Sequence, residues 1–164
     1  MMENIHREAA EAMPDFHLVG LRYFNVFGPG EAHKGKMASM VYQLALQMLS
    51  GKRPRVFHDG EQARDQVHVD DVVAANLAAM RDGAKAGIYN VGSGDATSFN
   101  QVIDALNEAL GTDLEPDYFD NPYDFYQDYT CADLSETQAG LGWSPSRTPR
   151  EAILDYAQRL AAAR

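Results

Sequence analysis

The chain has 164 residues, of which 45% are hydrophobic and 23% charged, a composition typical of one globular domain with its own core. The formal net charge of −10 argues against general nucleic-acid binding, which usually requires a basic surface. Cys131 is the single cysteine, so an internal disulfide is excluded and a reducing, cytoplasmic location is expected. We expect neither a membrane span, which needs about 20 apolar residues, nor a signal peptide.

Apolar periodicity and turn residues predict strands that alternate with helices, which is typical of an α/β fold with some parallel pairing. Helices are expected over residues 2–13, 37–49, 70–80, 98–110 and 133–140, and from 149 to near the C-terminus. Strands are expected over residues 17–26, 55–57, 66–69 and 87–91. Residues 112–131 contain aromatic side chains without a regular period. We expect an ordered irregular segment there, because aromatic side chains favour burial.

Capping signals mark several helix starts. Residues 98–101 and 148–151 have the spacing of a capping box, in which the first and fourth side chains each accept a backbone N–H. Asp70 or Asp71 is expected to cap the helix that follows the third strand, because a short acidic side chain can accept the free N–H groups there.

The segment after the first strand carries the strongest functional signal. Gly28-Pro29-Gly30 ends the strand, and Lys34 and Lys36 follow in a glycine-flanked loop before the next helix. Helix N-termini favour anions, and open α/β sheets bind ligands at the carboxyl ends of their strands. The pattern therefore indicates an anionic ligand, with two solvated lysines as the alternative.

Arg64 is a second candidate, because a guanidinium can hold a diphosphate through paired hydrogen bonds. An ion pair with Asp65 or Glu61 is the alternative. Gly92-Ser93-Gly94 lacks the full glycine fingerprint of a phosphate loop, so a tight turn is expected there. The five histidines are dispersed, and no metal site is predicted.

Several segments resemble the extended short-chain dehydrogenase/reductase superfamily. The matching segments are Arg22–Pro29, Arg64–Val72, Tyr89–Gly94 and Leu141–Pro145. Two narrower segments, His33–Ser39 and Tyr126–Asp133, resemble the family of ADP-L-glycero-D-manno-heptose 6-epimerases. The resemblance covers nearly the whole chain. It implies the C-terminal, substrate-binding portion of such an enzyme, with a few strands of an incomplete Rossmann sheet.

On this resemblance, residues 1–164 are one domain. Residues 1–27 and 86–92 would be remnants of the cofactor-binding sheet, and residues 28–85 and 93–164 would be mostly substrate-binding. The family's glycine-rich cofactor motif and its Tyr-x-x-x-Lys pair precede the matched region. We therefore expect weak or no NADP binding and no activity by the chain alone. An exposed sheet edge predicts self-association or pairing with a separate N-terminal half.

The resemblance also implies roles for individual residues. Lys34 would be a catalytic acid/base and, with Val26, a contact of NADP. The neighbouring charge of Lys36 and partial burial of the Lys34 amine would favour this role. The substrate contacts would be Asn25, Lys36, Gln43, Phe57, Arg64 and Tyr126.

The substrate implied is ADP-glycero-manno-heptose, oxidised and reduced again at C6. Lys36 and Gln43 stand where better-known members often carry a small hydroxyl residue and a histidine, and the loop from Phe57 to Arg64 is one residue shorter. These differences leave other ADP- or UDP-sugars open. The chain would then be half of a UDP- or dTDP-sugar 4-epimerase or 4,6-dehydratase, or a non-catalytic module that binds sugar nucleotides.

Overall fold

The computed structural model describes residues 2–120 and 126–163. Its helices are α1 (Met2–Ala12), α2 (Met40–Leu49), α3 (Val69–Ala79), α4 (Phe99–Leu110), α5 (Ser135–Leu141) and α6 (Pro149–Ala162), with a 3-10 segment η1 (Glu31–Met37). Its strands are β1 (Val19–Tyr23), β2 (Asn25–Phe27), β3 (Arg55–Phe57), β4 (Ala63–His68), β5 (Gly87–Val91), β6 (Ala96–Ser98) and β7 (Asp117–Phe119).

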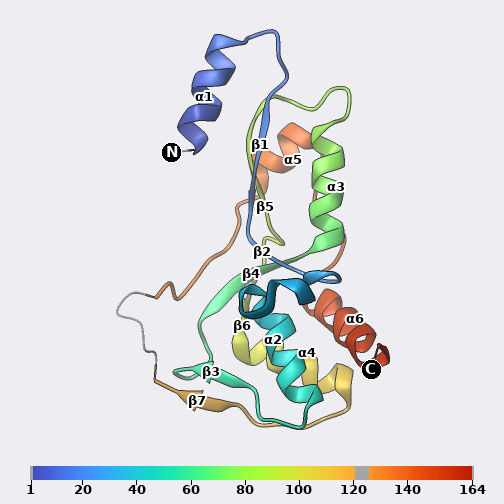
Figure 1. Cartoon of the computed structure of the whole chain (residues 1–164). Helices are drawn as coiled ribbons and strands as arrows, with labels where there is room; N and C mark the ends of the chain where they lie inside the picture. The colour runs from blue at the N-terminus through green and yellow to red at the C-terminus, as the bar shows by residue number, and fades with distance from the viewer. Residues whose placement is uncertain (1, 121–125, 164) are drawn as a thin grey trace.

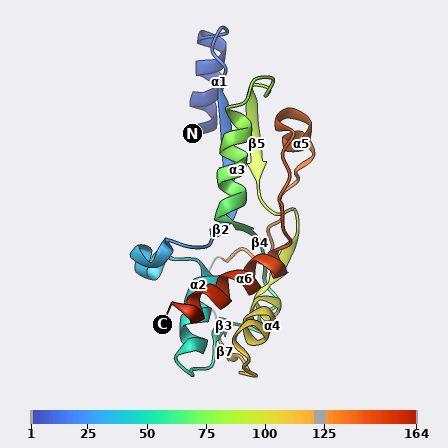
Figure 2. The ribbon, with the colours of Figure 1, turned by 90° about the vertical axis from the view of Figure 1, so that its right-hand side faces the viewer.

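The molecule is elongated and has two packed ends (Figure 1). One end contains α1, β1, β5, α3 and α5, and the other contains α2, α4, α6, β3 and β7. Strands β2 and β4 lie where the two ends meet. Figure 2 shows the same division from the side, with η1 projecting from the body of the molecule.

Parallel pairing dominates the strands, which confirms the predicted α/β class. β1 pairs with β5, β2 with β4, and β3 with β7, all parallel, while β6 runs antiparallel to β4. The expected strand 17–26 is divided at Phe24, whose backbone N–H bonds to Val91 O before the chain turns towards β4. One predicted strand thus serves two sheets.

Each end has its own hydrophobic core. In the first, apolar side chains of α3 and β5 pack with Leu141, the last residue of α5, and with Trp143, which follows that helix. In the second, α2, α4 and α6 bury an apolar stripe each, centred on Leu44, Ile103 and Ile153, which are fully buried. Helices α3 and α5 therefore pack with β1 and β5, although they lie within the ranges assigned mostly to substrate binding. That assignment stays a prediction.

The helix caps follow the sequence with one exception. Both capping boxes form as predicted, at the starts of α4 and α6. The cap of α3 was predicted wrongly: the side chain of His68 accepts the Asp70 N–H at 3.2 Å. Asp71 instead accepts hydrogen bonds from the N–H and Oγ of Ser146, at 2.9 and 2.7 Å. Asp71 therefore does not cap α3, because its carboxylate is hydrogen-bonded to a residue that is distant in the sequence.

Some elements were not predicted. β7 lies inside the segment 112–131, where the sequence indicated irregular structure, and residues 121–125 of that segment lie outside the described residues. β4 begins three residues earlier than expected, and η1 fills the basic loop. Among the described residues, no helix is long and apolar enough to cross a membrane.

A buried carboxylate joins β4 to two other segments. Asp65 is fully buried and accepts four hydrogen bonds: from Ser93 N and Oγ at 2.6 and 2.8 Å, from Gly94 N at 3.0 Å and from Ala132 N at 2.9 Å. A Cβ on Gly92 would lie 2.7 Å from this carboxylate, so only glycine fits there. The predicted tight turn at 92–94 therefore forms around the buried carboxylate of Asp65.

Candidate active site at the junction of the two ends

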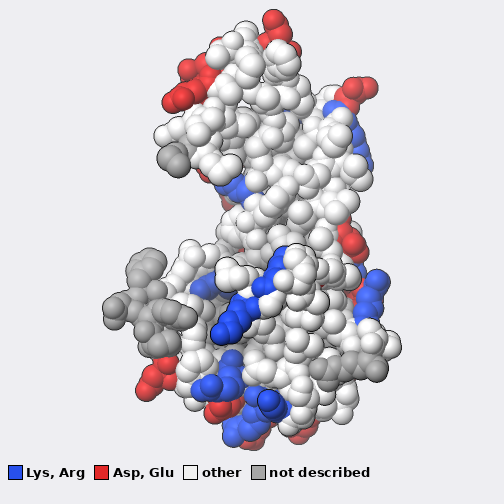
Figure 3. Space-filling view, in the orientation of Figure 1, with Lys and Arg blue, Asp and Glu red and all other residues white. Residues whose placement is uncertain are grey.

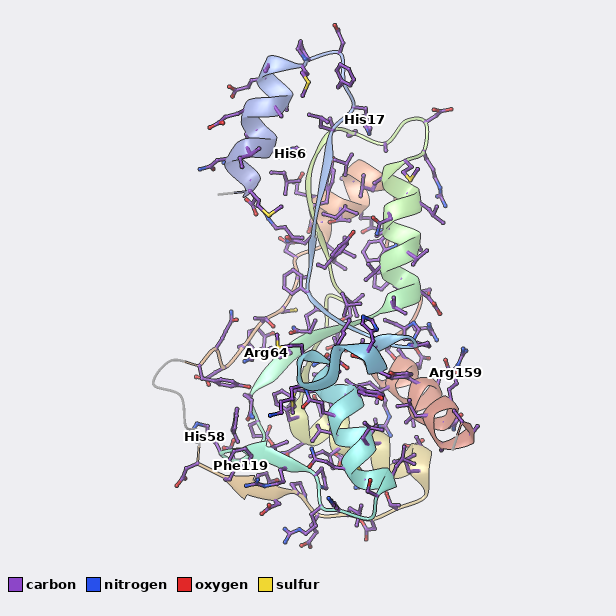
Figure 4. The ribbon with its side chains drawn as sticks, in the orientation of Figure 1. His6, His17, His58, Arg64, Phe119 and Arg159 are labelled. Atoms are coloured by element: carbon purple, nitrogen blue, oxygen red, sulfur yellow. The ribbon has the colours of Figure 1, made fainter. Side chains whose placement is uncertain are left out.

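A cavity of about 380 Å³ lies where the two ends meet. Of the predicted site residues, five line it: Asn25, Val26, Lys34, Arg64 and Tyr126. Gln66, Phe99 and the segment 37–40 complete the lining. Figure 4 places Arg64 on β4 at this junction, away from Arg159 on α6. Residues from distant parts of the sequence thus meet in one cavity.

Strand geometry explains why these side chains converge. Neighbouring residues of paired strands point to the same face, and side chains alternate along each strand. Asn25 of β2 is in register with Gln66 of β4, and Arg64 lies two residues before Gln66 on the same strand. All three consequently face the cavity. Asn25 is held in place by donating from Nδ2 to Asp65 O at 3.1 Å.

The Arg64 guanidinium bonds to backbone oxygens and not to a carboxylate. It donates to Ala63 O at 2.9 Å and to Gln127 O, and its Cζ lies 5.0 Å from the centre of the Tyr126 ring. Among the described residues it forms no ion pair, so the predicted alternative of a salt bridge to Asp65 or Glu61 is not observed. A cation without an acidic partner beside a cavity is suited to bind a phosphate.

An aromatic cluster closes one end of the cavity. The Phe57 ring lies 4.7 Å from Phe119 and 5.4 Å from Tyr126, measured between ring centroids, in edge-to-face arrangements. These rings line a smaller cavity of about 80 Å³ together with Arg55, whose Cζ lies 4.4 Å from the Phe119 centroid. Tyr126 belongs to both cavities, and burial raises the pKa of its phenol. Figure 4 shows Phe119 and His58 at this aromatic end.

The basic loop closes the other end. A third cavity, of about 210 Å³, is lined by residues 26–31 with His33, Lys34 and Val69. Val26 and Lys34 also line the central cavity, so the two spaces adjoin. Gly28 has a φ of 138°, and a Cβ there would lie 2.8 Å from the Val69 side chain, so glycine is required at this turn.

Glu31 is buried and fixes this loop through hydrogen bonds, a role that the sequence did not indicate. It is 3% exposed and accepts hydrogen bonds from Gly28 N at 3.2 Å, Ser39 N at 2.6 Å and Ser39 Oγ at 2.9 Å. Ser39 also caps α2 by accepting the Tyr42 N–H. Burial, together with the charge of Glu31, raises the pKa of Tyr156 on α6. One carboxylate thus fixes both ends of the loop that carries the lysines.

The lysines lie on the outside of this loop. Lys34 and Lys36 are both exposed, so the expected partial burial of Lys34 is not observed. Lys34 still lines the central cavity, whereas Lys36 lines none of the three cavities. Gln43 also lies outside them and donates from Nε2 to Ala38 O at 2.7 Å and Lys36 O at 3.3 Å. Figure 3 shows lysine and arginine side chains gathered on this face of the second end.

Two buried polar residues of β4 were missed in the sequence. Gln66 lines the central cavity and is 4% exposed. His68, 2% exposed, lies beside Arg147, which is 2.8 Å from its Nδ1. Burial, followed by the charge of Arg147, lowers the pKa of His68. Both residues follow Arg64 at intervals of two, so strand alternation was the signal that could have identified them. The described residues contain no cluster of potential metal ligands.

Known proteins similar to this chain in sequence or in structure include several nucleotide-sugar epimerases. The ADP-L-glycero-D-manno-heptose-6-epimerase of Brachyspira hyodysenteriae is 40% identical over 147 residues, which cover 87% of this chain and 46% of that protein. The crystal structure of the corresponding enzyme from Helicobacter pylori matches with a TM-score of 0.84 and 40% identity, covering 94% of this chain and 48% of that one. The UDP-glucose 4-epimerase of Thermotoga maritima, solved with UDP-glucose, matches with a TM-score of 0.84 and 31% identity, over 98% and 52% of the two chains.

The chain therefore spans about half the length of the relatives it matches. Other similar structures, at 25% identity or more, are complexes with a UDP-sugar and NAD. The sequence pattern of the NAD dependent epimerase/dehydratase family matches residues 1–92. With this match and the fold of nucleotide-sugar epimerases, the chain belongs to the NAD dependent epimerase/dehydratase family.

Proposed function

We propose that this chain is the substrate-binding part of an NADP-dependent epimerase that acts on ADP-glycero-manno-heptose in the cytoplasm and is inactive by itself. The convergence of Asn25, Val26, Lys34, Arg64 and Tyr126 on one cavity is the observation that supports this function most. The 40% identity to ADP-heptose epimerases of two bacteria favours an ADP-sugar over other nucleotide sugars.

In this proposal the three adjoining cavities bind successive parts of the substrate. Arg64 holds the diphosphate, because its guanidinium has no acidic partner among the described residues. The rings of Phe57 and Tyr126 border the nucleotide, and Asn25 contacts the sugar. Lys36 on η1 and Gln43 on α2 line none of the three cavities, so the geometry does not add support for direct substrate contact by them.

The loop cavity suits the nicotinamide end of the cofactor. It combines the Lys34 ammonium and the backbone of Gly28–Gly30 with apolar Val26 and Val69, which fits a ring with a polar amide. NADP⁺, when bound, would accept a hydride from the substrate and then return it. Lys34 would donate a proton to the substrate oxygen during reduction and accept one during oxidation. Val26 would support the ring.

Calorimetry with the chain itself tests the binding part of this function. ADP-glucose is expected to bind, and Arg64→Met is expected to weaken binding about 10- to 100-fold, the effect of losing a charged hydrogen bond. Arg159→Met, which removes an exposed arginine of α6, serves as the matched control. Absence of ADP-glucose binding, or equal binding by the Arg64 variant, would contradict the proposal. NADP alone should bind weakly or not at all, and micromolar affinity would refute that expectation.

A UDP-sugar enzyme is the second candidate, because the Thermotoga maritima UDP-glucose 4-epimerase matches this fold as well as the ADP-heptose epimerase does. The same titration distinguishes the two candidates. Tighter binding of UDP-glucose than of ADP-glucose would favour half of a 4-epimerase. Binding of either sugar nucleotide without turnover, after addition of a separately produced N-terminal half, would favour a non-catalytic module.

A further inference from the structure

Gln66 is a buried polar residue of the central cavity whose amide has an unused hydrogen-bonding atom. The residue is 4% exposed, and its Oε1 is buried without a hydrogen-bond partner in the part of the chain that the structure describes. Native proteins pair almost all buried acceptors, because an unpaired one has lost its water without replacement. An unpaired acceptor in a cavity wall therefore indicates a partner that comes from outside the chain.

The position of Gln66 in the sheet restricts what that partner can be. Gln66 lies between the predicted diphosphate contact, Arg64, two residues away on β4, and the predicted sugar contact, Asn25, its register partner on β2. Because both strands are paired in the sheet, the backbone of Gln66 is fixed at the cavity wall. Gln66 lines the cavity between the residues predicted to contact the diphosphate and the sugar.

We propose that the Gln66 amide binds a hydroxyl group of the sugar of the nucleotide sugar, an inference that rests on the proposed function. A hydroxyl carries a proton that it can donate to Oε1, whereas a phosphate oxygen at neutral pH is an acceptor only. The rest of the lining suits a sugar ring, since Val26, Met40 and Phe99 offer apolar surface beside the polar groups. Gln66 is thus a binding residue that reads the sugar and not the nucleotide.

Titration of the chain with ADP-glucose and with ADP tests this inference. Gln66→Met keeps the length of the side chain and removes the amide. It should weaken ADP-glucose binding about tenfold, equal to about 1.4 kcal/mol, while ADP binding stays within about twofold of the original. Gln158→Met, on the exposed side of α6, is the control. Because Oε1 has no partner among the residues that the structure describes, Gln66→Met should also leave the urea midpoint unchanged or raise it, unlike the loss of a structural hydrogen bond.

The outcomes separate this inference from the proposed function. If the unaltered chain binds both probes and the variant binds ADP-glucose equally well, the role of Gln66 is refuted and the proposed function stands. If the variant loses affinity for ADP and ADP-glucose alike, or loses stability, Gln66 acts on the nucleotide or the fold, and the inference is also refuted. If the unaltered chain binds neither probe, the proposed function fails and the role of Gln66 fails with it.

Discussion

The four hydrogen bonds accepted by Asp65 predict that this carboxylate is among the most sensitive positions of the fold. Each oxygen accepts two of them: Oδ1 from the N–H and Oγ of Ser93, and Oδ2 from Gly94 N and Ala132 N. Asp65→Asn keeps one carbonyl oxygen and turns an NH2 group towards two donors. Two donors then lose their acceptor: Gly94 N and Ala132 N if the NH2 group replaces Oδ2, or the N–H and hydroxyl of Ser93 if it replaces Oδ1.

The size of the effect follows from these contacts. An unsatisfied buried donor costs about 1–3 kcal/mol, and breaking a buried charged network costs about 3–5 kcal/mol. We therefore expect Asp65→Asn to lower the free energy of unfolding by about 3–5 kcal/mol. With a typical urea m-value of about 2 kcal/mol/M, the midpoint should fall by roughly 1.5–2.5 M.

Urea unfolding followed by circular dichroism measures this shift, and amide hydrogen exchange locates it. Protection should be lost first at Gly94 and Ala132. Asp104→Asn, on the exposed side of α4, makes the same chemical change without buried partners and should move the midpoint by less than about 0.3 M. A similarly small shift for Asp65→Asn would refute the argument that this carboxylate joins β4 to the other segments.

Three further predictions follow from single residues. Gly60→Ala should destabilise the chain by more than about 2 kcal/mol, because its Cβ would lie 2.2 Å from Asn100 Oδ1 and would displace an amide that is hydrogen-bonded to Asp59 O and to the Tyr118 hydroxyl. Gly51→Ala shares the positive φ but meets no atom within 4 Å, so equal urea midpoints for the two variants would refute this reasoning. The lowered pKa of His68 means that the unfolded chain takes up its proton first, so stability should be full above about pH 6.5 and fall as the pH drops towards the folded-state pKa. In His68→Asn, the free energy of unfolding measured across pH 5–8 should depend less steeply on pH. An unchanged slope would contradict this prediction. In an enzyme reconstituted with its N-terminal half, Lys34→Ala should reduce turnover about 10²- to 10⁴-fold, and unchanged turnover would exclude an acid/base role.

Sequence reasoning predicted local structure well where the signal is local. The capping boxes at the starts of α4 and α6 formed because both partners lie within four residues. Their helices therefore began where predicted. β7 was missed because its three residues, Asp117–Phe119, have no distinctive pattern and are held by pairing with β3, about sixty residues away. Such pairing leaves no periodic signal in either segment.

The candidate site likewise has features that the sequence could predict and features that depend on distant contacts. Family resemblance identified Asn25, Arg64 and Tyr126, whose side chains converge on the central cavity. It could not indicate that Gln43 bonds to backbone oxygens outside the cavity, because the same residue type serves both purposes. Nor could it indicate that Arg64 has no acidic partner among the described residues, because Asp65, its neighbour in the sequence, points to the opposite face of the strand.

The buried acids explain how an acidic chain can present a basic site. Glu31 and Asp65 are buried, and each accepts hydrogen bonds from backbone N–H groups of a turn that borders or supports the site. Their charge is thus used inside the fold to fix the chain, while the exposed lysines of η1 and the guanidinium of β4 remain available to a ligand. Because screening by solvent weakens exposed charges more than buried ones, added salt should weaken ligand binding before it weakens the fold. The same division explains why net charge alone did not reveal an anion site: the sign of the total, −10, is set by acids elsewhere on the surface and in the interior.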